Sequence, residues 1–573
     1  MGKSEPISGG QAVVEIFKLQ GIEYIFSSPG TEWVPVWEAL AKMKALEERG
    51  PQYVNCRHEE LAVAMASGYS EMTGRLPAVL LHTTVGTLHG AMALREAYQK
   101  QVPMVVCAGD SVTFGEQKGL DPGFQWPRFL ADIGGSARVA EPYVKWSGTV
   151  NSRATLPGMV YRAGQLAMSP PQGPVFLSIP LELMFEEVDP ELIPEAFASP
   201  APPRVDSEAL EQAAHFLVQS QNPVIITENA GRSPEAVERL VQLAELLGAP
   251  VVECQSPMYL NFPRSHPLHA GYNAKSLLQE ADVVFVVAAI GPWYPPSAGS
   301  PKAQVIVLDD NPTHEQLPYW GYKANLYLMG HVPSALSTLV ERVKALTDRD
   351  REKKSLLKER LNRWKATHEQ LRQAWVEEAL ESKGKNPIDP KWLCYALNEV
   401  LPENAIVVEE TIVHMRFIRR YIERIQPQGF FRGASGGLGT GLGVALGLKW
   451  AAQDRLVVAL MGDGAFNYNP VLPALGFAQE YQVPILIVIF NNQSYASMKG
   501  AHLQFYPDGW TARTGTFYGV DITPTPDYAG LMKLFDGYGE RVEDAHEIQP
   551  TLLRAMEEVR NGKPALVDVV LQE

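Results

Sequence analysis

The sequence predicts an α/β protein with three doubly wound parallel-sheet domains. Apolar runs of strand length alternate with helical segments along most of the chain, a pattern typical of parallel sheets covered by helices on both faces. A proline-rich stretch at 198–206 and a charged segment at 342–370 interrupt this alternation. We therefore expect the domains to span 1–190, 205–345 and 385–573.

The first block alternates between strand-like and helical segments. Its apolar runs predict strands at 22–28, 77–84, 103–109 and 174–180. The segment 58–74 between the first two runs has a helical pattern.

The second and third blocks repeat this plan. In the second block, strands are expected at 223–229, 249–254, 281–289 and 303–310. In the third block, they are expected at 405–410, 455–463, 483–492 and 564–572. The similar size and plan of the first and third blocks hint at a duplication. The charged segment between the second and third blocks predicts an exposed helix or helical linker with no function of its own.

Composition excludes several classes of protein. The 573 residues carry a net charge of −15, which argues against a nucleic-acid partner and against an anionic membrane. No secretory signal and no apolar stretch long enough to span a bilayer is recognisable. The cysteines lie far apart without a C-x-x-C pair, which indicates buried thiols in a reducing compartment. We expect a cytoplasmic protein.

Polar residues end two predicted strands of the third block. Asp463 lies in a Gly-Asp-Gly turn after one strand, and Asn492 ends the next strand, 29 residues later. In open α/β sheets, ligands bind at this carboxyl edge. An aspartate, an amide oxygen and a nearby carbonyl suit Mg²⁺, which often binds through substrate phosphates. Gly-Asp-Gly alone is more often a plain turn, but the combination is far more specific.

A glycine cluster at 433–453 precedes this pair. One interpretation is close helix packing. The other is a loop that wraps tightly around a flat ligand, with Leu438 as its one bulky side chain.

The segment from Asp463 to Asn492 resembles the thiamine diphosphate motif of the 2-oxo acid decarboxylase and acetolactate synthase superfamily. The similarity extends over nearly the whole chain, and the motifs are most similar to those of benzoylformate decarboxylases. It implies an N-terminal pyrimidine-binding domain, a central domain and a C-terminal diphosphate-binding domain. It also implies thiamine diphosphate and Mg²⁺ as cofactors, with Mg²⁺ held by the side chains of Asp463 and Asn492 and by the Ser494 carbonyl.

The same resemblance implies further contacts to the cofactor. Gly464, Ala465 and Tyr495 would contact the diphosphate through their backbone. Leu438 would lie under the cofactor and bend it into a V shape. The Gly436 carbonyl would hold the aminopyrimidine, and Thr411 would lie nearby.

The first block supplies the remaining candidates. By the resemblance, Glu59 would bond the far nitrogen of the pyrimidine ring, with its neighbour Glu60 as the alternative. His82 matches an active-site histidine of benzoylformate decarboxylases and would relay protons. Thr31 matches a substrate-contacting serine. Taken singly, a glutamate at a helix start is usually solvated and a lone histidine is usually structural.

Some positions depart from the family pattern. His89 stands where relatives commonly have asparagine, and the segment 291–299 lacks the histidine expected there. The arginine-bearing flavin segment expected after 281–289 is also missing, so we expect no FAD.

Bulky residues favour an apolar pocket for aromatic or branched acids, if their side chains face it. These candidates are Trp33, Trp293, Tyr294, Phe466 and Met498.

The resemblance therefore implies a thiamine diphosphate- and Mg²⁺-dependent lyase. It would decarboxylate a 2-oxo acid through an enamine intermediate and would also ligate aldehydes. The alternatives are an acyl-transferring carboligase like acetolactate synthase, a 2-hydroxyacyl-CoA lyase, and a non-catalytic binding protein of the same fold. Glu59 and Asp463 lie in different domains, and in the family these come from different subunits, so we expect a homodimer or a dimer of dimers.

Overall fold

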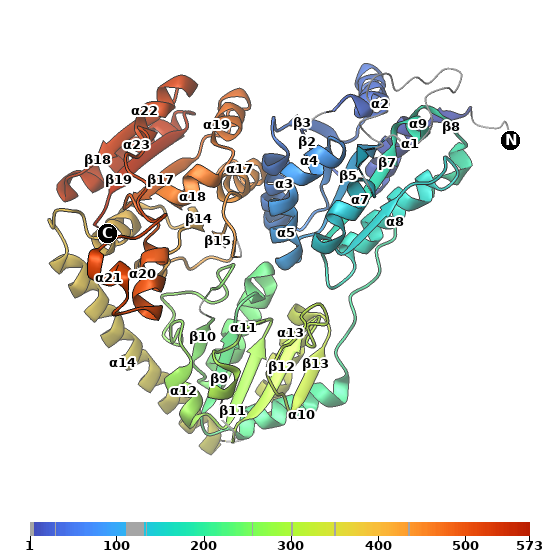
Figure 1. Cartoon of the computed structure of the whole chain (residues 1–573). Coiled ribbons are helices and arrows are strands. Elements are labelled where there is room, and N and C mark those ends of the chain that lie inside the picture. The colour runs from blue at the N-terminus through green and yellow to red at the C-terminus, as the bar shows by residue number, and fades with distance from the viewer. Residues whose placement is uncertain are drawn as a thin grey trace.

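The computed structural model describes residues 5–28, 30–110, 131–132, 134–254, 256–299, 302–348, 351–433 and 436–572. Three sheets of parallel strands, each flanked by helices, follow one another along the chain (Figure 1). This arrangement confirms the predicted fold class.

The first sheet lies in the N-terminal domain. Its strands, in spatial order, are β3 (Gln52–Asn55), β2 (Tyr24–Ser27), β4 (Ala78–Leu81), β5 (Met104–Asp110), β7 (Pro174–Pro180) and β6 (Trp146–Thr149). The helices around it include α1 (Gly9–Leu19), α2 (Val34–Ala45), α3 (Glu59–Thr73), α4 (Thr83–His89), α5 (Ala91–Gln99) and α8 (Leu156–Met168). The strand order reverses between β2 and β4, so a ligand site is expected where these two strands end.

The central domain has a five-stranded sheet. Its strands are β10 (Val251–Glu253), β9 (Pro223–Thr227), β11 (Val283–Val287), β12 (Gln304–Asp309) and β13 (Leu326–Met329). Its principal helices are α10 (Ser207–Gln219), α11 (Pro234–Leu247) and α13 (Val332–Thr347). Valines and isoleucines that are buried on both faces fill β9 and β11, as expected for parallel strands.

The third sheet lies in the C-terminal domain. Its strands are β15 (Phe430–Arg432), β14 (Ile406–Glu410), β16 (Val457–Gly462), β17 (Leu486–Asn491), β19 (Ala565–Val570) and β18 (Tyr538–Val542). Its helices include α15 (Pro390–Val400), α17 (Gly441–Ala451), α18 (Asp463–Tyr468), α19 (Val471–Glu480), α20 (Ala496–Phe505) and α23 (Ile548–Arg560). Numbered within each sheet, the strand order is 2-1-3-4-6-5 in both the first and the third sheet, which supports the duplication at which the sequence hints.

The N-terminal and C-terminal domains contact each other through α3 and α17, which lie side by side (Figure 1). Two glycines make this contact possible. A Cβ on Gly68 would overlap the carbonyl of Val444, and a Cβ on Gly447 would overlap the carbonyl of Met65. The two helices therefore pack backbone against backbone, which only glycine permits at these positions.

The charged segment forms the end of α13 and much of α14 (Arg351–Glu381), a long helix on the outside of the molecule (Figure 1). The prediction of a merely solvated connector is wrong for two side chains. Arg360 is buried and donates from Nη1 to the Leu247 carbonyl at 3.2 Å. His368 is buried and contacts the His269 carbonyl through Nδ1 at 3.1 Å. These contacts attach α14 to the central domain.

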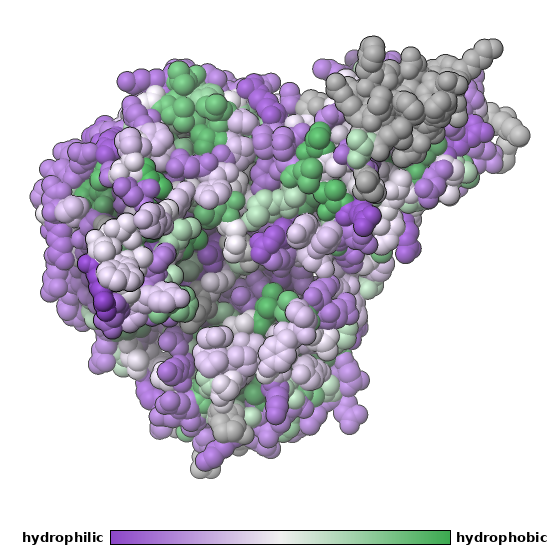
Figure 2. Space-filling view, viewed as in Figure 1, coloured by the Kyte–Doolittle hydropathy of each residue, from purple (hydrophilic) through white to green (hydrophobic). Residues whose placement is uncertain are grey.

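The surface is largely hydrophilic on the face shown in Figure 2, with hydrophobic residues in separate patches. This distribution agrees with the acidic composition of the chain. None of the helices in the described part of the chain combines the length and the apolar character needed to cross a bilayer.

Candidate active site

Asp463 connects the ends of two neighbouring strands of the third sheet. It is the first residue of α18, directly after β16, and is only 3% exposed. Oδ1 accepts the Gly464 N–H at 2.7 Å, and Oδ2 accepts the Gln493 N–H, just beyond β17, at 2.6 Å. Burial raises the pKa of Asp463 to about 6, and the Asp568 carboxylate adds to this effect. A divalent cation would stabilise the ionised form of this buried carboxylate, so the site fits Mg²⁺.

The two asparagines at the end of β17 differ in their surroundings. Asn492 is buried beside the Asp463 turn, as a metal ligand would be. Asn491 donates from Nδ2 to Asp568 Oδ1 at 2.9 Å and thereby connects β17 to β19. Ser494 forms an isolated antiparallel bridge with Asp521, which fixes the backbone that carries its carbonyl.

Gly464 and Ala465 follow Asp463 in the first turn of α18. The ring of Tyr495 lies against Gly464 so closely that a Cβ at this position would overlap it. The Tyr495 N–H donates to the Val520 carbonyl at 2.8 Å. The structure therefore brings the three residues predicted to contact the diphosphate next to the predicted metal ligands.

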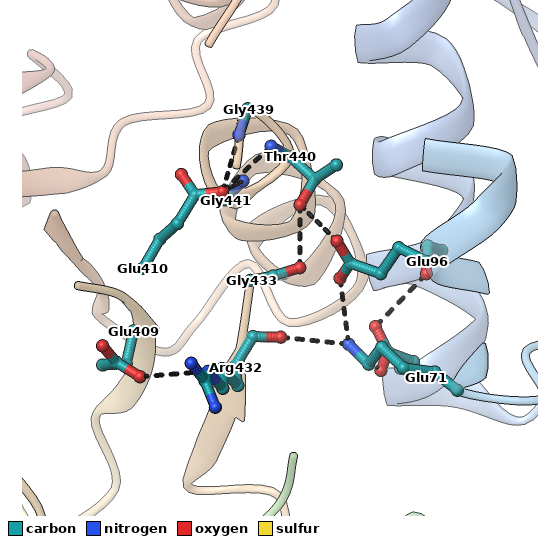
Figure 3. Close-up of polar contacts among 11 residues, drawn as sticks. Glu71, Glu96, Glu409, Glu410, Arg432, Gly433, Gly439, Thr440 and Gly441 are labelled. Atoms are coloured by element: carbon teal, nitrogen blue, oxygen red, sulfur yellow. Dashed lines mark hydrogen bonds and ion pairs between the residues drawn. The ribbon is translucent and has the colours of Figure 1, made fainter. Parts of the chain in front are cut away.

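Glu410 organises the glycine-rich loop that precedes α17. One of its oxygens, Oε1, accepts the N–H groups of Gly439, Thr440 and Gly441 at 2.9, 3.1 and 3.2 Å (Figure 3). The other, Oε2, accepts from Asn469 Nδ2 at 2.7 Å. Burial raises the pKa of Glu410 to about 7 despite these bonds.

Glu410 thereby supports the segment that carries two predicted cofactor contacts, Gly436 and Leu438. Gly436 has a φ of +71° and Gly439 one of +113°, conformations that favour glycine. Thr411 is buried, and its hydroxyl donates to Glu409 Oε1 at 2.5 Å, so this hydroxyl is already engaged within the domain. Sequence reasoning missed Glu410, although it directly precedes Thr411 at a strand end.

A buried charged network joins the N-terminal domain to the same loop (Figure 3). Lys100 Nζ lies 2.5 Å from Glu71 Oε1 and donates to the Arg432 carbonyl at 3.1 Å. Glu96, one turn before Lys100, accepts a hydrogen bond from the Thr440 hydroxyl. Burial raises the pKa of Glu96 to about 8.

The structure distinguishes Glu59 from Glu60 at the start of α3. The Glu59 side chain is 12% exposed, and its Oε2 lies 3.4 Å from His89 Nδ1. A Cβ on Gly86 would lie 3.1 Å from Glu59 Oε1, so α4 packs closely beside this carboxylate. Glu60 is buried and accepts the Ala93 N–H at 3.3 Å, and burial raises its pKa to about 8. Of the two carboxylates, Glu59 is the one that a ligand can reach.

His82 follows β4 and pairs with Glu32, which lies just after β2. Its Nδ1 is 3.0 and 2.9 Å from the two oxygens of Glu32. Glu32 is 1% exposed and fills the space left by Gly30 and Gly109, where a Cβ would overlap it. The hydrogen bond to Glu32 raises the pKa of His82 against the opposing effect of burial.

This pair lies where the strand order of the first sheet reverses. Thr31, the predicted substrate contact, is the exposed residue directly before Glu32. Sequence reasoning missed Glu32, and its position beside Thr31 after a strand was the one available signal.

Two of the residues predicted to line an apolar pocket belong to the core instead. Trp33 is fully buried and donates from Nε1 to the Leu81 carbonyl at 2.9 Å. Phe466 is buried and packs edge-on against Tyr528. Tyr294 and Met498 are exposed, and Trp293 is partly buried, so these three remain candidates.

Comparison with known proteins agrees with this geometry. Residues 7–124 match the thiamine pyrophosphate enzyme N-terminal TPP binding domain, 210–339 match the central domain, and 413–569 match the C-terminal TPP binding domain. The chain belongs to the thiamine pyrophosphate enzyme family. Glu59 and His82 lie in its N-terminal TPP binding domain, and Asp463 lies in its C-terminal one.

Relatives of this thiamine pyrophosphate enzyme match over almost their whole length. The acetolactate synthase large subunit of Buchnera aphidicola is 27% identical, over 99% of this chain and 95% of the relative. Benzoylformate decarboxylase of Pseudomonas aeruginosa is also 27% identical, over 98% of each chain. The thiamine diphosphate-dependent 4-hydroxybenzoylformate decarboxylase of Rhodococcus jostii has a similar structure, with a TM-score of 0.79, 25% identity and 99% of each chain covered.

Proposed function

We propose that the protein is a thiamine diphosphate- and Mg²⁺-dependent lyase that decarboxylates an aromatic or branched apolar 2-oxo acid. Carboligation of aldehydes is proposed as an accompanying reaction. The observation that carries the proposal is the Glu32–His82 pair, in which a buried carboxylate holds an accessible histidine. The pair lies in the same N-terminal domain as Glu59 and provides an anchored acid–base group.

The residues suited to hold the cofactor belong to both outer domains. Mg²⁺ would be bound by the side chains of Asp463 and Asn492 and by the Ser494 carbonyl. The backbone of Gly464, Ala465 and Tyr495 would contact the diphosphate. Leu438, the Gly436 carbonyl, Thr411 and Glu59 would position the rings. When bound, thiamine diphosphate supplies a carbanion that adds to carbonyl carbons and a positively charged ring that accepts the electron pair left behind when CO₂ departs.

Side chains of the N-terminal domain would move protons around this centre. Glu59 would share a proton with the pyrimidine nitrogen, because its carboxyl is accessible whereas that of Glu60 is buried. His82 directs Nδ1 to Glu32, which leaves Nε2 to exchange a proton with the substrate. The hydroxyl of Thr31 would bind the substrate carboxylate.

A second candidate function is that of an acyl-transferring carboligase. The similarity to acetolactate synthases favours it, since these relatives match the chain as fully as benzoylformate decarboxylase does. A 2-hydroxyacyl-CoA lyase is a variant of this alternative. A non-catalytic binding protein is disfavoured, because it would have no need of Glu59 together with Asp463 and Asn492.

A substrate panel separates these functions. The purified protein would be incubated with thiamine diphosphate, Mg²⁺ and individual 2-oxo acids, while CO₂ release and the organic products are measured. A decarboxylase releases CO₂ and aldehyde from a single acid. A carboligase also releases CO₂ from its donor acid, but it joins the remaining fragment to a second carbonyl compound and so yields a ketol or acyl product in place of the aldehyde. No CO₂ release and no condensation product from any acid would contradict both candidates.

We also propose that the enzyme works as a homodimer or a dimer of dimers with shared sites. Glu59 and Asp463 lie in different domains, and in the family each cofactor lies between domains of two subunits. A cytoplasmic location is supported by the cysteines Cys56, Cys107, Cys254 and Cys394, all of which are buried and free.

A further inference from the structure

The start of α3 and the end of α4 bring three metal-binding side chains together. His58, Glu59 and His89 each present a ligand atom, and these atoms all lie within 4.8 Å of one another. This is the only such group of histidine, cysteine and acidic residues among the residues that the structure describes. The rings of His58 and His89 are stacked, with centroids 5.4 Å apart and planes inclined by 10°.

We propose that these three residues bind a transition-metal cation such as Zn²⁺, and that this cation competes with thiamine diphosphate for Glu59. The binding of the metal rests on the three side chains alone. The competition rests also on the proposed function, because it requires Glu59 to contact the cofactor.

Only small side-chain movements would bring the three ligand atoms to the separations that zinc requires. Zinc binds imidazole nitrogens and carboxylate oxygens at about 2.0–2.2 Å in a tetrahedron, which places its ligand atoms about 3.3 Å apart. The Glu59–His89 pair already approaches this separation at 3.4 Å. His89 is 63% exposed, so its ring can rotate at little cost in lost packing.

His58 has one nitrogen available for a metal. Its Nδ1 accepts the Glu60 N–H at 3.1 Å as the cap of α3. A neutral imidazole has only one nitrogen lone pair in its plane, so this hydrogen bond must open when His58 coordinates a cation. Two imidazoles and one carboxylate would then hold the cation, with the remaining position taken by water. Two histidines and a glutamate with one position left to water is a donor set found in catalytic zinc sites.

The charges near the site are compatible with a cation. Arg57 is the nearest cationic residue in the sequence, and its guanidinium forms an ion pair with Glu480 on α19. The partial positive charge at the start of α3 repels a cation. The Glu59 carboxylate would attract the divalent cation over a shorter distance, so this attraction outweighs the repulsion.

The site would discriminate between metals. Imidazole favours Zn²⁺, Co²⁺ and Ni²⁺, whereas Mg²⁺ prefers oxygen ligands and binds imidazole poorly. The predicted Mg²⁺ site at Asp463 contains no imidazole. Mg²⁺ would therefore support cofactor binding without occupying the histidine site, while Zn²⁺ would engage the carboxylate that the pyrimidine needs.

Cobalt titration of the cofactor-free protein tests the metal site, read by the visible absorption of bound Co²⁺. We expect one Co²⁺ per chain, displaced by Zn²⁺ and unaffected by excess Mg²⁺. The variants His89→Asn and His58→Asn should each bind Co²⁺ more than about 100-fold more weakly, since even outer-shell partners are worth about 10- to 100-fold. Asparagine is itself a good helix cap, so His58→Asn preserves the start of α3.

A matched control replaces the histidine of another histidine–glutamate pair. His215 lies 3.3 Å from Glu211 on the exposed side of α10, and no third histidine, cysteine or acidic ligand joins them among the described residues. His215→Asn should leave Co²⁺ binding unchanged. Equal binding by the wild type and by His89→Asn, or no binding by the wild type, would overturn the proposed site.

Calorimetry tests the competition. Zn²⁺ should weaken thiamine diphosphate binding to the wild type in the presence of Mg²⁺, and His89→Asn should abolish this effect. If Co²⁺ binds at the three residues but thiamine diphosphate does not weaken its binding, the competition is wrong and the metal site stands. The proposed function is judged separately, by CO₂ release from the zinc-free enzyme loaded with Mg²⁺.

Discussion

Glu32 and His82 form a carboxylate–imidazole pair, with 2.9 Å between Oε2 and Nδ1, at the ends of two adjacent parallel strands. The carboxylate is completely enclosed, whereas 34% of the histidine side chain remains exposed. The ring is thus anchored on one side and accessible on the other. An acid–base group that must meet a substrate in a fixed orientation requires this arrangement.

The first prediction concerns this pair. Glu32→Gln should lower the pKa of His82, because the hydrogen bond to Glu32 is the largest influence that raises it. The imidazole would then lose its proton at lower pH, so the His82 limb in the pH profile of kcat/KM should move toward lower pH. We expect a loss in kcat of about 10²-fold or more for His82→Asn, in which this limb should vanish. A limb that stays in place in Glu32→Gln would show that Glu32 does not control His82.

The second prediction separates the two neighbouring glutamates. Glu59→Gln should bind thiamine diphosphate but slow proton–deuterium exchange at its C2, because an amide cannot share a proton with the ring nitrogen as a carboxylate does. Glu60→Gln is the matched control and should exchange at a rate close to that of the wild type. The reverse pattern would transfer the role to Glu60.

The third prediction concerns pH and stability. Burial raises the pKa of Glu60 from 4.5 to about 8, and the carboxylates of Glu96 and Glu410 contribute. Within this window, the folded protein keeps a proton that the unfolded chain has lost, so its free energy of unfolding falls as pH rises. The fall is at most about 1.4 kcal/mol per pH unit. Glu60→Gln removes this titration.

The thermal unfolding midpoint reports this effect. The unfolding midpoint of Glu60→Gln minus that of the wild type should be larger at about pH 8 than at about pH 5. The control Glu238→Gln replaces an exposed acid. Its unfolding midpoint should change between the two pH values by the same amount as that of the wild type. A Glu60→Gln difference that does not grow with pH would mean that Glu60 is ionised in the folded protein.

The fourth prediction tests the proposed Mg²⁺ site at the end of β16. Asp463→Ala should abolish activity and Mg²⁺-dependent thiamine diphosphate binding together, because the metal loses its one charged ligand from the protein. Calorimetry with and without Mg²⁺ measures this loss. Asp508→Ala, which removes an exposed aspartate of the same domain, should bind the cofactor normally. Normal cofactor binding by Asp463→Ala would refute the assignment.

The fifth prediction tests whether sites are shared between subunits. Glu59→Gln and Asp463→Ala chains, each inactive alone, would be mixed under conditions that exchange subunits. If Glu59 and Asp463 of one site come from different chains, a mixed dimer carries one site with both lesions and one with neither, so activity should return. Proven exchange without recovery would mean that each site forms within one chain.

The apolar strands could be predicted from sequence, whereas the edge strands other than β10 could not. The six residues of β17 are all buried, so their composition identifies the strand. The edge strands β3 and β18 alternate irregularly between buried and exposed positions and carry polar residues. Their pairing is set by the neighbouring strand, so no local pattern indicates it.

In the candidate site, too, the sequence marks some of the residues and not others. Asp463 and Asn492 were identifiable because glycines and strand ends mark their positions. Glu32 was missed because its partner, His82, lies 50 residues away and only the parallel sheet brings them together. Trp33 and Phe466 were assigned to a pocket because residue type does not reveal the direction of a side chain.

The direct packing of α3 on α17 has a consequence for how this chain can diverge. The outer domains meet along α3 and α17, where Gly68 and Gly447 leave no room for a larger residue. Substitutions at these two positions should therefore destabilise the protein and be removed by selection. The central domain meets the C-terminal domain differently, through a backbone bridge between Tyr259 and Phe431 and through side-chain contacts such as Arg264 Nη1 to the Ile422 carbonyl at 2.9 Å. Related chains should therefore differ least along the α3–α17 pair, and changes in substrate preference should arise away from it.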